Sequence, residues 1–249
     1  MPGVLDNVES FVPIDVKDAL ILVAFPTTGS ASSIAGQFLV RQLSLPLVGH
    51  IPLAEGAHLA AVEGGRITGL IRIYGGEVVC RLQGHCPRLY VVTTEIPVPK
   101  EVAPKVAALI CSWAKGARLL LVLEGVMRNE GDETPDVWCA AADPKVLKEF
   151  AGSKTEPMER ALIGGILGPI TTIARGVVPA GALIVEANKD HPDGRAAVAL
   201  LEALGRIVPD VVMDAKPLLK EAMILEGEIR NAQKSAKVAS EPEPVNSYI

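Results

Sequence analysis

The chain has 249 residues, of which 49% are hydrophobic and 21% charged, and its formal net charge is −5. That length is enough for a substantial hydrophobic core, and without a basic surplus nucleic acid is not expected as a partner. Four Phe, three Tyr and two Trp are fewer rings than the stacking surfaces of nucleic-acid binders carry. The N-terminal sequence MPGVLDNVES lacks the charged and apolar parts of a signal peptide, so we expect a cytoplasmic protein.

Short apolar runs alternate with segments whose apolar residues have helical spacing. The sequence predicts strands at 20–25, 48–53, 58–62, 67–73, 77–82, 89–94, 119–123, 137–141 and 183–186, with a hairpin turn at Gly75–Gly76. It predicts helices at 31–43, 101–115, 144–150, 160–175, 192–207 and 214–234. This alternation predicts an α/β fold, a three-layer α/β/α sandwich whose hairpin strands make the sheet mixed.

The longest apolar stretch, 164–185, could be mistaken for a membrane span. Arg175 lies near its middle, and Pro169 and Pro179 interrupt it, whereas a bilayer helix needs about 20 continuous apolar residues. We therefore predict a buried helix followed by a buried strand, and no association with a membrane.

The predicted last helix has an apolar stripe at Leu218, Ala222, Leu225 and Ile229. This stripe belongs either to the core or to the interface of a homo-oligomer. After Lys237 the sequence changes to prolines, acids and small residues, which cannot form a core. We predict a single α/β domain over 1–236 and a flexible C-terminal tail over 237–249.

The segment FPTTGSASSIAG, from Phe25 to Gly36, lies between a predicted strand and a predicted helix. Backbone N–H groups at such a position bind anions. The candidate ligand loop consists of Thr27, Thr28, Gly29, Ser30, Ser32 and Ser33. It lacks the lysine of a P-loop and the glycine spacing of a dinucleotide site. The other interpretation is structural: Gly29 makes a turn and Gly36 allows close packing of the helix on the sheet.

No sequence pattern identifies a catalytic centre. The chain has no Gly-x-Ser-x-Gly motif, and its histidines are His50, His58, His85 and His191. Glu124 and Glu186 are placed at strand ends, where a pair of carboxylates could act or simply face solvent. We expect no catalytic residue.

The cysteines Cys80, Cys86, Cys111 and Cys139 form no Cys-x-x-Cys pair. Cys80, His85 and Cys86 lie close together in sequence but lack a second pair of ligands. We therefore expect reduced cysteines that act as small core residues, and no metal or cofactor.

The chain ends in Ser247, Tyr248 and Ile249. Only three tyrosines occur in the sequence, and a ring on a flexible tail has no core to stabilise. Such a tail suits a pocket that takes a C-terminal carboxylate together with one aromatic side chain, although the position of Tyr248 could also be chance.

Several segments in order resemble the proteasome assembly chaperone family in its archaeal and bacterial branch. They are FPTTGSASSIAGQFLV, LLLVLEG, LIGGILGPITTIARG with ALIVEAN, HPDGRAAVALLEAL and DAKPLLKEAMILEGEI, over roughly residues 15–232. The resemblance implies a nucleoside-phosphorylase-like α/β/α fold, homo-oligomers and no established catalysis.

The resemblance also gives the tail a role. Proteasome-binding proteins of the related type end in a hydrophobic residue, tyrosine and any residue; Tyr248 matches and Ser247 departs. The resemblance implies that such tails enter pockets between α-subunits of the 20S proteasome, where a lysine of the pocket pairs with the C-terminal carboxylate. The sequence therefore predicts a non-enzymatic assembly chaperone or adaptor of the 20S proteasome. The alternative is an enzyme of phosphorylase-like fold that binds a small molecule such as a nucleoside or phosphate.

Overall fold

The computed structural model describes residues 8–52, 59–77, 88–128, 134–153, 155–209 and 214–224. Within them, one sheet has nine strands, in the spatial order β1 (Glu9–Ser10), β3 (Leu47–Ile51), β6 (Ile71–Glu77), β7 (Arg88–Thr93), β2 (Leu20–Ala24), β8 (Leu119–Met127), β11 (Ala180–Ala187), β9 (Val137–Ala141) and β10 (Glu156–Pro157). The central strands β7, β2, β8 and β11 are parallel, and the antiparallel pairs lie outside them. The sheet is therefore mixed, as predicted.

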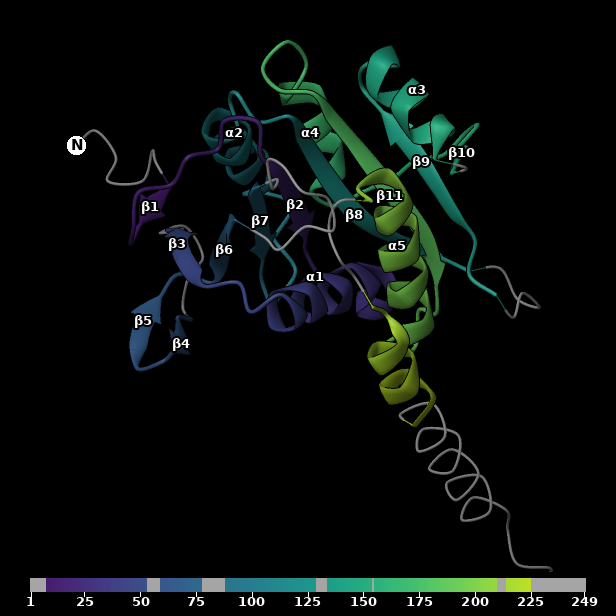
Figure 1. The fold of residues 1–249 in the computed structure, drawn as a ribbon, viewed down its shortest axis with the longest axis horizontal. Helices are drawn as coiled ribbons and strands as arrows, with labels where there is room; N and C mark the ends of the chain where they lie inside the picture. Colours follow the sequence, from purple (N-terminus) through teal and green to yellow (C-terminus); the bar gives the residue numbers. More distant parts are fainter. Residues whose placement is uncertain are drawn as a thin grey trace, which may run out of the picture.

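Helices cover both faces of this sheet (Figure 1). The helices are α1 (Ala31–Gln42), α2 (Ala103–Trp113), α3 (Pro144–Gly152), α4 (Leu167–Ile173) and α5 (Gly194–Ile207), and residues 216–224 are also helical. Helices α1, α3 and α5 pack on one face, and α2 and α4 pack on the other. The predicted three-layer α/β/α sandwich is thus confirmed.

The core follows from the period-2 alternation of the buried strands. In β2, Leu20 and Leu22 join the cluster under α1 and α5, while Ile21 and Val23 join the cluster under α2 and α4. A strand buried on both faces needs a continuous apolar run, which is how 20–25 was recognised. Gly36 of α1 lies against β2, because a Cβ there would come within 2.4 Å of the Ala24 Cβ. This is the close packing that the structural interpretation of the loop predicts.

The predicted hairpin turn at Gly75–Gly76 is wrong. Both glycines lie inside β6, and a Cβ on Gly75 would come within 2.3 Å of the Tyr90 ring on β7. The turn lies instead at Gly64 and Gly65, which have φ of 56° and 80° and connect two strands of a separate hairpin. These strands are β4 (Ala61–Glu63) and β5 (Arg66–Thr68). The predicted strand 67–73 is consequently divided between β5 and β6.

Other predicted boundaries shift for identifiable reasons. The helix predicted at 160–175 begins only at Leu167, because Gly165 has the left-handed φ of 70°. The helix predicted at 192–207 begins at Gly194, with Asp193 rather than Pro192 at its start. The apolar stretch 164–185 forms α4 and most of β11, the predicted helix and strand. No helix in the described ranges is both long and apolar enough to span a bilayer.

Four predicted elements reach beyond the described ranges, of which strands 48–53 and 58–62 do so by one residue each. Strand 77–82 is covered only at its first residue, and helix 214–234 only to residue 224. Leu218 and Ala222 of its stripe are buried, whereas Leu225 and Ile229 lie outside those ranges. The division into a domain over 1–236 and a tail over 237–249, and the nucleoside-phosphorylase-like detail of the fold, stay predictions.

Candidate functional site

The candidate ligand loop lies at the carboxyl ends of the central parallel strands, the edge where α/β folds bind ligands. It contains a short 3-10 turn, η1 (Thr28–Ser30), between β2 and α1. Gly29 has φ 61°, and its carbonyl accepts a hydrogen bond from the Asp193 N–H at 2.8 Å. A Cβ at Gly29 would come within 2.7 Å of the Asn188 carbonyl oxygen. The loop is therefore pressed against the segment between β11 and α5, and Gly29 is the turn residue that this requires.

The hydroxyl groups of the loop are bonded within the chain. Ser32 Oγ donates to the Phe25 carbonyl, so Thr27 Oγ1, 2.8 Å from Ser32 Oγ, is the donor of that pair. Thr27 Oγ1 also accepts from the Gly125 N–H at 2.9 Å, and Ser33 Oγ donates to the Ser30 carbonyl at 3.0 Å. These bonds join the loop to the end of β8. Binding of a ligand by Thr27, Thr28, Gly29, Ser30, Ser32 and Ser33 stays a prediction.

Asp193 connects the neighbouring elements at this edge. One carboxylate oxygen accepts from the Ala196 N–H at 2.9 Å and caps α5. The other accepts from the Asn188 N–H and from an Arg128 Nη, each at 2.9 Å. Asp193 is 4% exposed, and Arg128 also donates to the Glu186 carbonyl at 3.1 Å. Sequence analysis missed this pair, although an Asp at the start of a predicted helix is a recognisable cap signal.

The prediction that Glu124 ends its strand is wrong, because β8 continues to Met127. Glu124 is 4% exposed, and its Oε2 has no hydrogen-bond partner among the described residues. Burial raises the pKa of this carboxyl to about 8, against the opposing effect of the Gly125 backbone. At neutral pH the Glu124 carboxyl is therefore protonated and carries no charge inside the fold.

The two predicted strand-end acids lie on the same face of the sheet. Parallel register pairs Glu124 with Ile184, and Ile184 packs in the cluster beneath α2 and α4. Glu186, two residues further along β11, therefore faces the same helices. Both side chains are buried, so neither is a solvent-facing acid. Glu186 pairs with Val126, so the two acids lie two residues apart along adjacent strands. A pair of acting carboxylates stays an untested alternative to the expectation of no catalytic residue.

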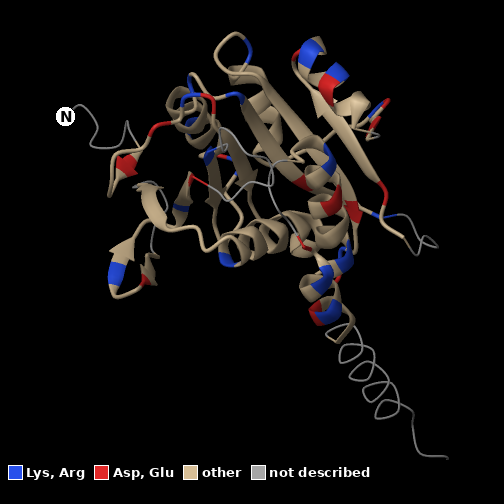
Figure 2. Ribbon diagram, in the orientation of Figure 1, with Lys and Arg blue, Asp and Glu red and all other residues tan. Residues whose placement is uncertain are grey.

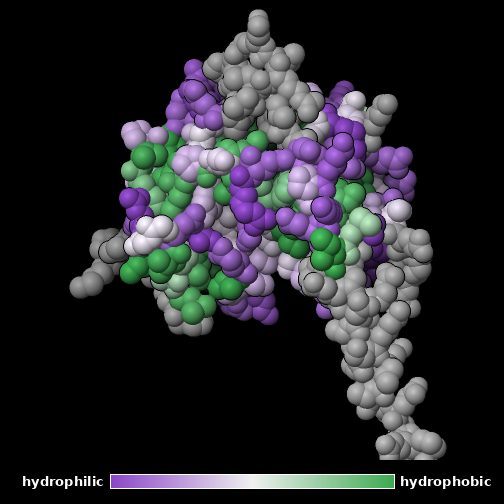
Figure 3. All heavy atoms as spheres, turned by 60° about the horizontal axis from the view of Figure 1, so that its bottom comes forward, coloured by the Kyte–Doolittle hydropathy of each residue, from purple (hydrophilic) through white to green (hydrophobic). Residues whose placement is uncertain are grey.

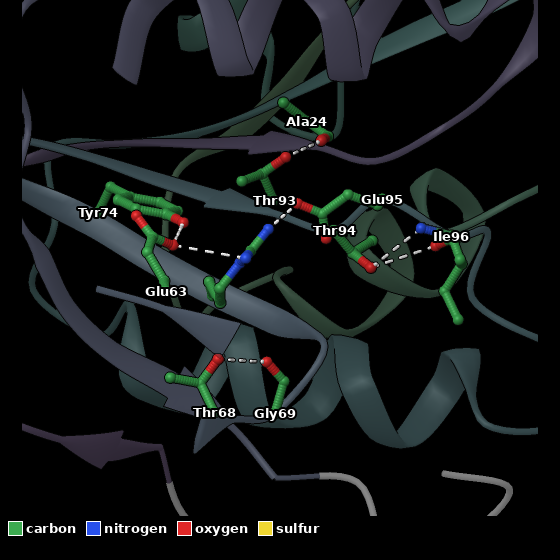
Figure 4. Close-up of polar contacts among 10 residues, drawn as sticks. Ala24, Glu63, Thr68, Gly69, Tyr74, Thr93, Thr94, Glu95 and Ile96 are labelled. Carbon is green, nitrogen blue, oxygen red and sulfur yellow. Dashed lines mark hydrogen bonds and ion pairs between the residues drawn. The ribbon is translucent and has the colours of Figure 1, made fainter. Parts of the chain in front are cut away.

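A second polar cluster, which sequence analysis missed, links the β4–β5 hairpin to the sheet (Figure 4). The buried Arg72 guanidinium on β6 pairs with Glu63 of β4 at 3.4 Å and with Glu95, which follows β7. Tyr74 donates its hydroxyl proton to Glu63. Burial, followed by the bond to Glu63, raises the pKa of Tyr74, so the phenol stays protonated. Arg72 and Tyr74 alternate with isoleucine along β6, a signal that could have identified a polar side of this strand.

The outer face of the hairpin is apolar. Val62 and Ile67 are cross-strand partners, 68% and 72% exposed, and Leu59 beside them is also exposed. Figure 3 shows hydrophobic surface on the left of its view, the side where β4 and β5 lie in Figure 1. Exposed apolar patches of this kind mark protein contacts.

Removing the Tyr74 hydroxyl should loosen this hairpin specifically. We expect Tyr74→Phe to cost about 1 kcal/mol of stability and to speed amide exchange in residues 61–68. Tyr90→Phe is the matched control, since its hydroxyl donates to the Asp15 carbonyl away from the hairpin. Equal exchange in both variants would show that the Tyr74–Glu63 bond does not hold the hairpin.

The remaining candidate residues are not brought into one site. His50 Nε2 lies 3.0 Å from Glu9, and His191 Nδ1 lies 3.0 Å from the Pro192 carbonyl. Cys111 and Cys139 are buried free thiols, as expected of core cysteines, and burial raises the pKa of Cys111 to about 11. In the part of the chain that the structure describes, no three His, Cys, Asp or Glu residues are grouped as a metal site would require. His58, His85, Cys80, Cys86 and the tail residues Ser247, Tyr248 and Ile249 lie outside the described residues.

Comparison with known proteins places this fold among solved structures. It matches the crystal structure of Pyrococcus furiosus PbaA, described as an archaeal homolog of proteasome-assembly chaperone, with TM-score 0.80 and 23% identity over 94% of each chain. Pyrococcus furiosus PbaB, described as an archaeal proteasome activator, matches with TM-score 0.78 and 17% identity over 91% of this chain and 98% of its own. An uncharacterised protein of Methanocaldococcus jannaschii is 22% identical over 231 residues, 91% of either chain.

These likenesses establish the fold, and a family model carries the assignment further. The model of the PAC2 family matches residues 21–233, from the second residue of β2 to beyond the last described residue, 224. The span agrees with the range of roughly 15–232 over which the sequence segments resemble the proteasome assembly chaperones, and that resemblance is confirmed. By this match, the chain belongs to the PAC2 family.

Proposed function

We propose that this protein is a non-enzymatic assembly chaperone or adaptor that binds the 20S proteasome or its α-subunits. The observation that carries the proposal is membership of the PAC2 family, together with the structural likeness to PbaA and PbaB. The hydrogen bonds that occupy the loop hydroxyls support a structural rather than a catalytic use of that loop.

Docking through the C-terminus is the proposed mechanism. Tyr248 would fill a pocket between α-subunits and the Ile249 carboxylate would pair with a cation there. We also propose a cytoplasmic homo-oligomer, in which several tails would engage one proteasome and add avidity without new contacts. The exposed Val62–Ile67 pair supports contacts between copies.

The tail can be tested by capture of purified 20S particles and of free α-subunits. Removing residues 247–249, or Tyr248→Ala, should weaken binding by about tenfold or more, because a buried aromatic anchor dominates such contacts. Ser247→Leu should strengthen binding, because it restores the apolar residue of the related motif. Asn246→Ala is the matched control and should bind like the parent.

The possible outcomes of this experiment test different parts of the proposal. Binding that persists unchanged in Tyr248→Ala removes the tail from the mechanism but leaves a proteasome-binding protein. No binding by the parent chain to either form contradicts the proposed function. Thermal stabilisation of the purified protein by a nucleoside, nucleotide or phosphate would instead favour the alternative, a small-molecule enzyme of phosphorylase-like fold.

A further inference from the structure

The β4–β5 hairpin turns its polar side inward and its apolar side outward. Glu63 pairs with Arg72 of the main sheet, and Thr68 is 3% exposed. Val62 and Ile67 are the chain neighbours of Glu63 and Thr68, so they point to the opposite face, where they are 68% and 72% exposed. A hairpin that packs on one face alone normally places its apolar residues on that face. The inverted pattern indicates that a second surface covers the outer face.

The outer face of the hairpin carries no charge. Strands β4 and β5 contain one acidic and one basic residue, Glu63 and Arg66 (Figure 2). These two are cross-strand partners next to the Val62–Ile67 pair, so they belong to the inner face. Arg66 Cζ lies 4.4 Å from the centre of the Phe11 ring. A second chain with the same net charge of −5 can therefore approach the outer face without like charges meeting at the contact.

The exposed apolar residues of this face are all aliphatic. Leu59, which precedes β4 and is 51% exposed, adds to Val62 and Ile67. Contacts with unrelated partners are dominated by tryptophan, tyrosine and arginine, whereas interfaces between identical subunits are richer in apolar area. A two-fold contact places the same residues on both sides, so a charged residue near its centre would meet its own like charge. The composition of the outer face therefore favours a second copy of the chain as its occupant.

We propose that two copies of the chain associate face to face through the outer faces of their β4–β5 hairpins. In this two-fold contact, Val62 of one copy packs against Ile67 of the partner subunit, and Leu59 borders the contact. A standard interface buries about 800 Å² on each partner, so the hairpins form its apolar centre and the surface around them forms its rim. The inference rests on the homo-oligomer proposed above and assigns the surface that holds two of its copies together.

The native mass of the full chain, measured by light scattering during size-exclusion chromatography at micromolar concentration, tests this contact. Ile67→Asp should raise the dissociation constant of the contact by about tenfold or more, because it places two like charges in an apolar interface. Leu162→Asp is the matched control: Leu162 is fully exposed outside the hairpin, and this variant should keep the mass of the parent. A mixture of Ile67→Asp and Ile67→Lys should associate more tightly than either variant alone, since unlike copies then pair opposite charges.

A monomeric parent would overturn both this contact and the proposed homo-oligomer. An oligomeric parent whose mass is unchanged in Ile67→Asp would overturn the hairpin contact alone, and so would a mixture that associates no better than its parts. Unchanged mass with loss of 20S capture would assign the outer face to the proteasome instead. Because Ile67 is 72% exposed, its variants should keep the fold, which urea unfolding verifies, and Val62→Asp on the other strand gives an independent second test.

Discussion

Asp193→Ala should destabilise the protein by about 3 kcal/mol in urea unfolding. The substitution removes the cap of α5, a loss of about 1 kcal/mol, and leaves Arg128 without its carboxylate partner. Breaking a buried ion pair from one side costs about 3–5 kcal/mol, and the partial exposure of Arg128, 15% of its side chain, places the expected value near the lower end. The Asn188 N–H, which Asp193 also satisfies, loses its acceptor as well.

Asp143→Ala is the matched control for this prediction. Asp143 caps α3 as Asp193 caps α5, with an acceptor distance of 2.7 Å to Lys145 N–H, but it holds no arginine. We expect a loss of about 1 kcal/mol there. Equal losses in the two variants would show that the Arg128 pair and the Asn188 bond contribute nothing beyond a cap. Asp193→Asn should fall between the two, since it keeps an acceptor and loses the charge.

The sequence predicts the layers of this fold better than its turns. Apolar runs such as 20–25 identify buried strands, because burial on both faces demands continuous hydrophobicity. The glycine pairs Gly64–Gly65 and Gly75–Gly76 carry the same local signal, yet only the first is a turn. What separates them is the Tyr90 ring, which lies against Gly75 from the neighbouring strand. That contact is tertiary, and no local pattern contains it.

The candidate site, like the fold, could be predicted only in part from the sequence. The loop 25–36 could be located from the order of strand, hydroxyl-rich loop and helix, because that order fixes its place at the carboxyl edge of the sheet. The Arg128–Asp193 pair joins residues 65 positions apart, and the Arg72–Glu95 pair joins a strand to a loop. Such partners depend on sheet order, in which β6 lies beside β7 and β8 lies beside β11. Sequence spacing does not give that order.

Glu124→Gln should make the protein more stable at alkaline pH and flatten its pH dependence. The pKa of Glu124 is raised by burial from 4.5 to about 8, so the folded state holds a proton that the unfolded state releases above pH 4.5. Stability from this group is therefore greatest below pH 4.5 and falls as the pH rises towards 8, above which it levels off. At 1.36 kcal/mol for each pKa unit, the loss between pH 6 and pH 9 should be about 2–3 kcal/mol.

Glutamine matches the neutral carboxyl in shape and cannot ionise, so this loss should disappear in Glu124→Gln. Unfolding in urea at pH 6 and pH 9 measures it, with Glu202→Gln on the exposed side of α5 as the control that keeps the parent slope. An unchanged slope in Glu124→Gln would mean that Glu124 is ionised in the folded protein. It would then need a cation near its Oε2, which has no partner among the described residues. That result would make the carboxyl edge beneath α4 a charged site, with Glu186 on the adjacent strand as its second acid.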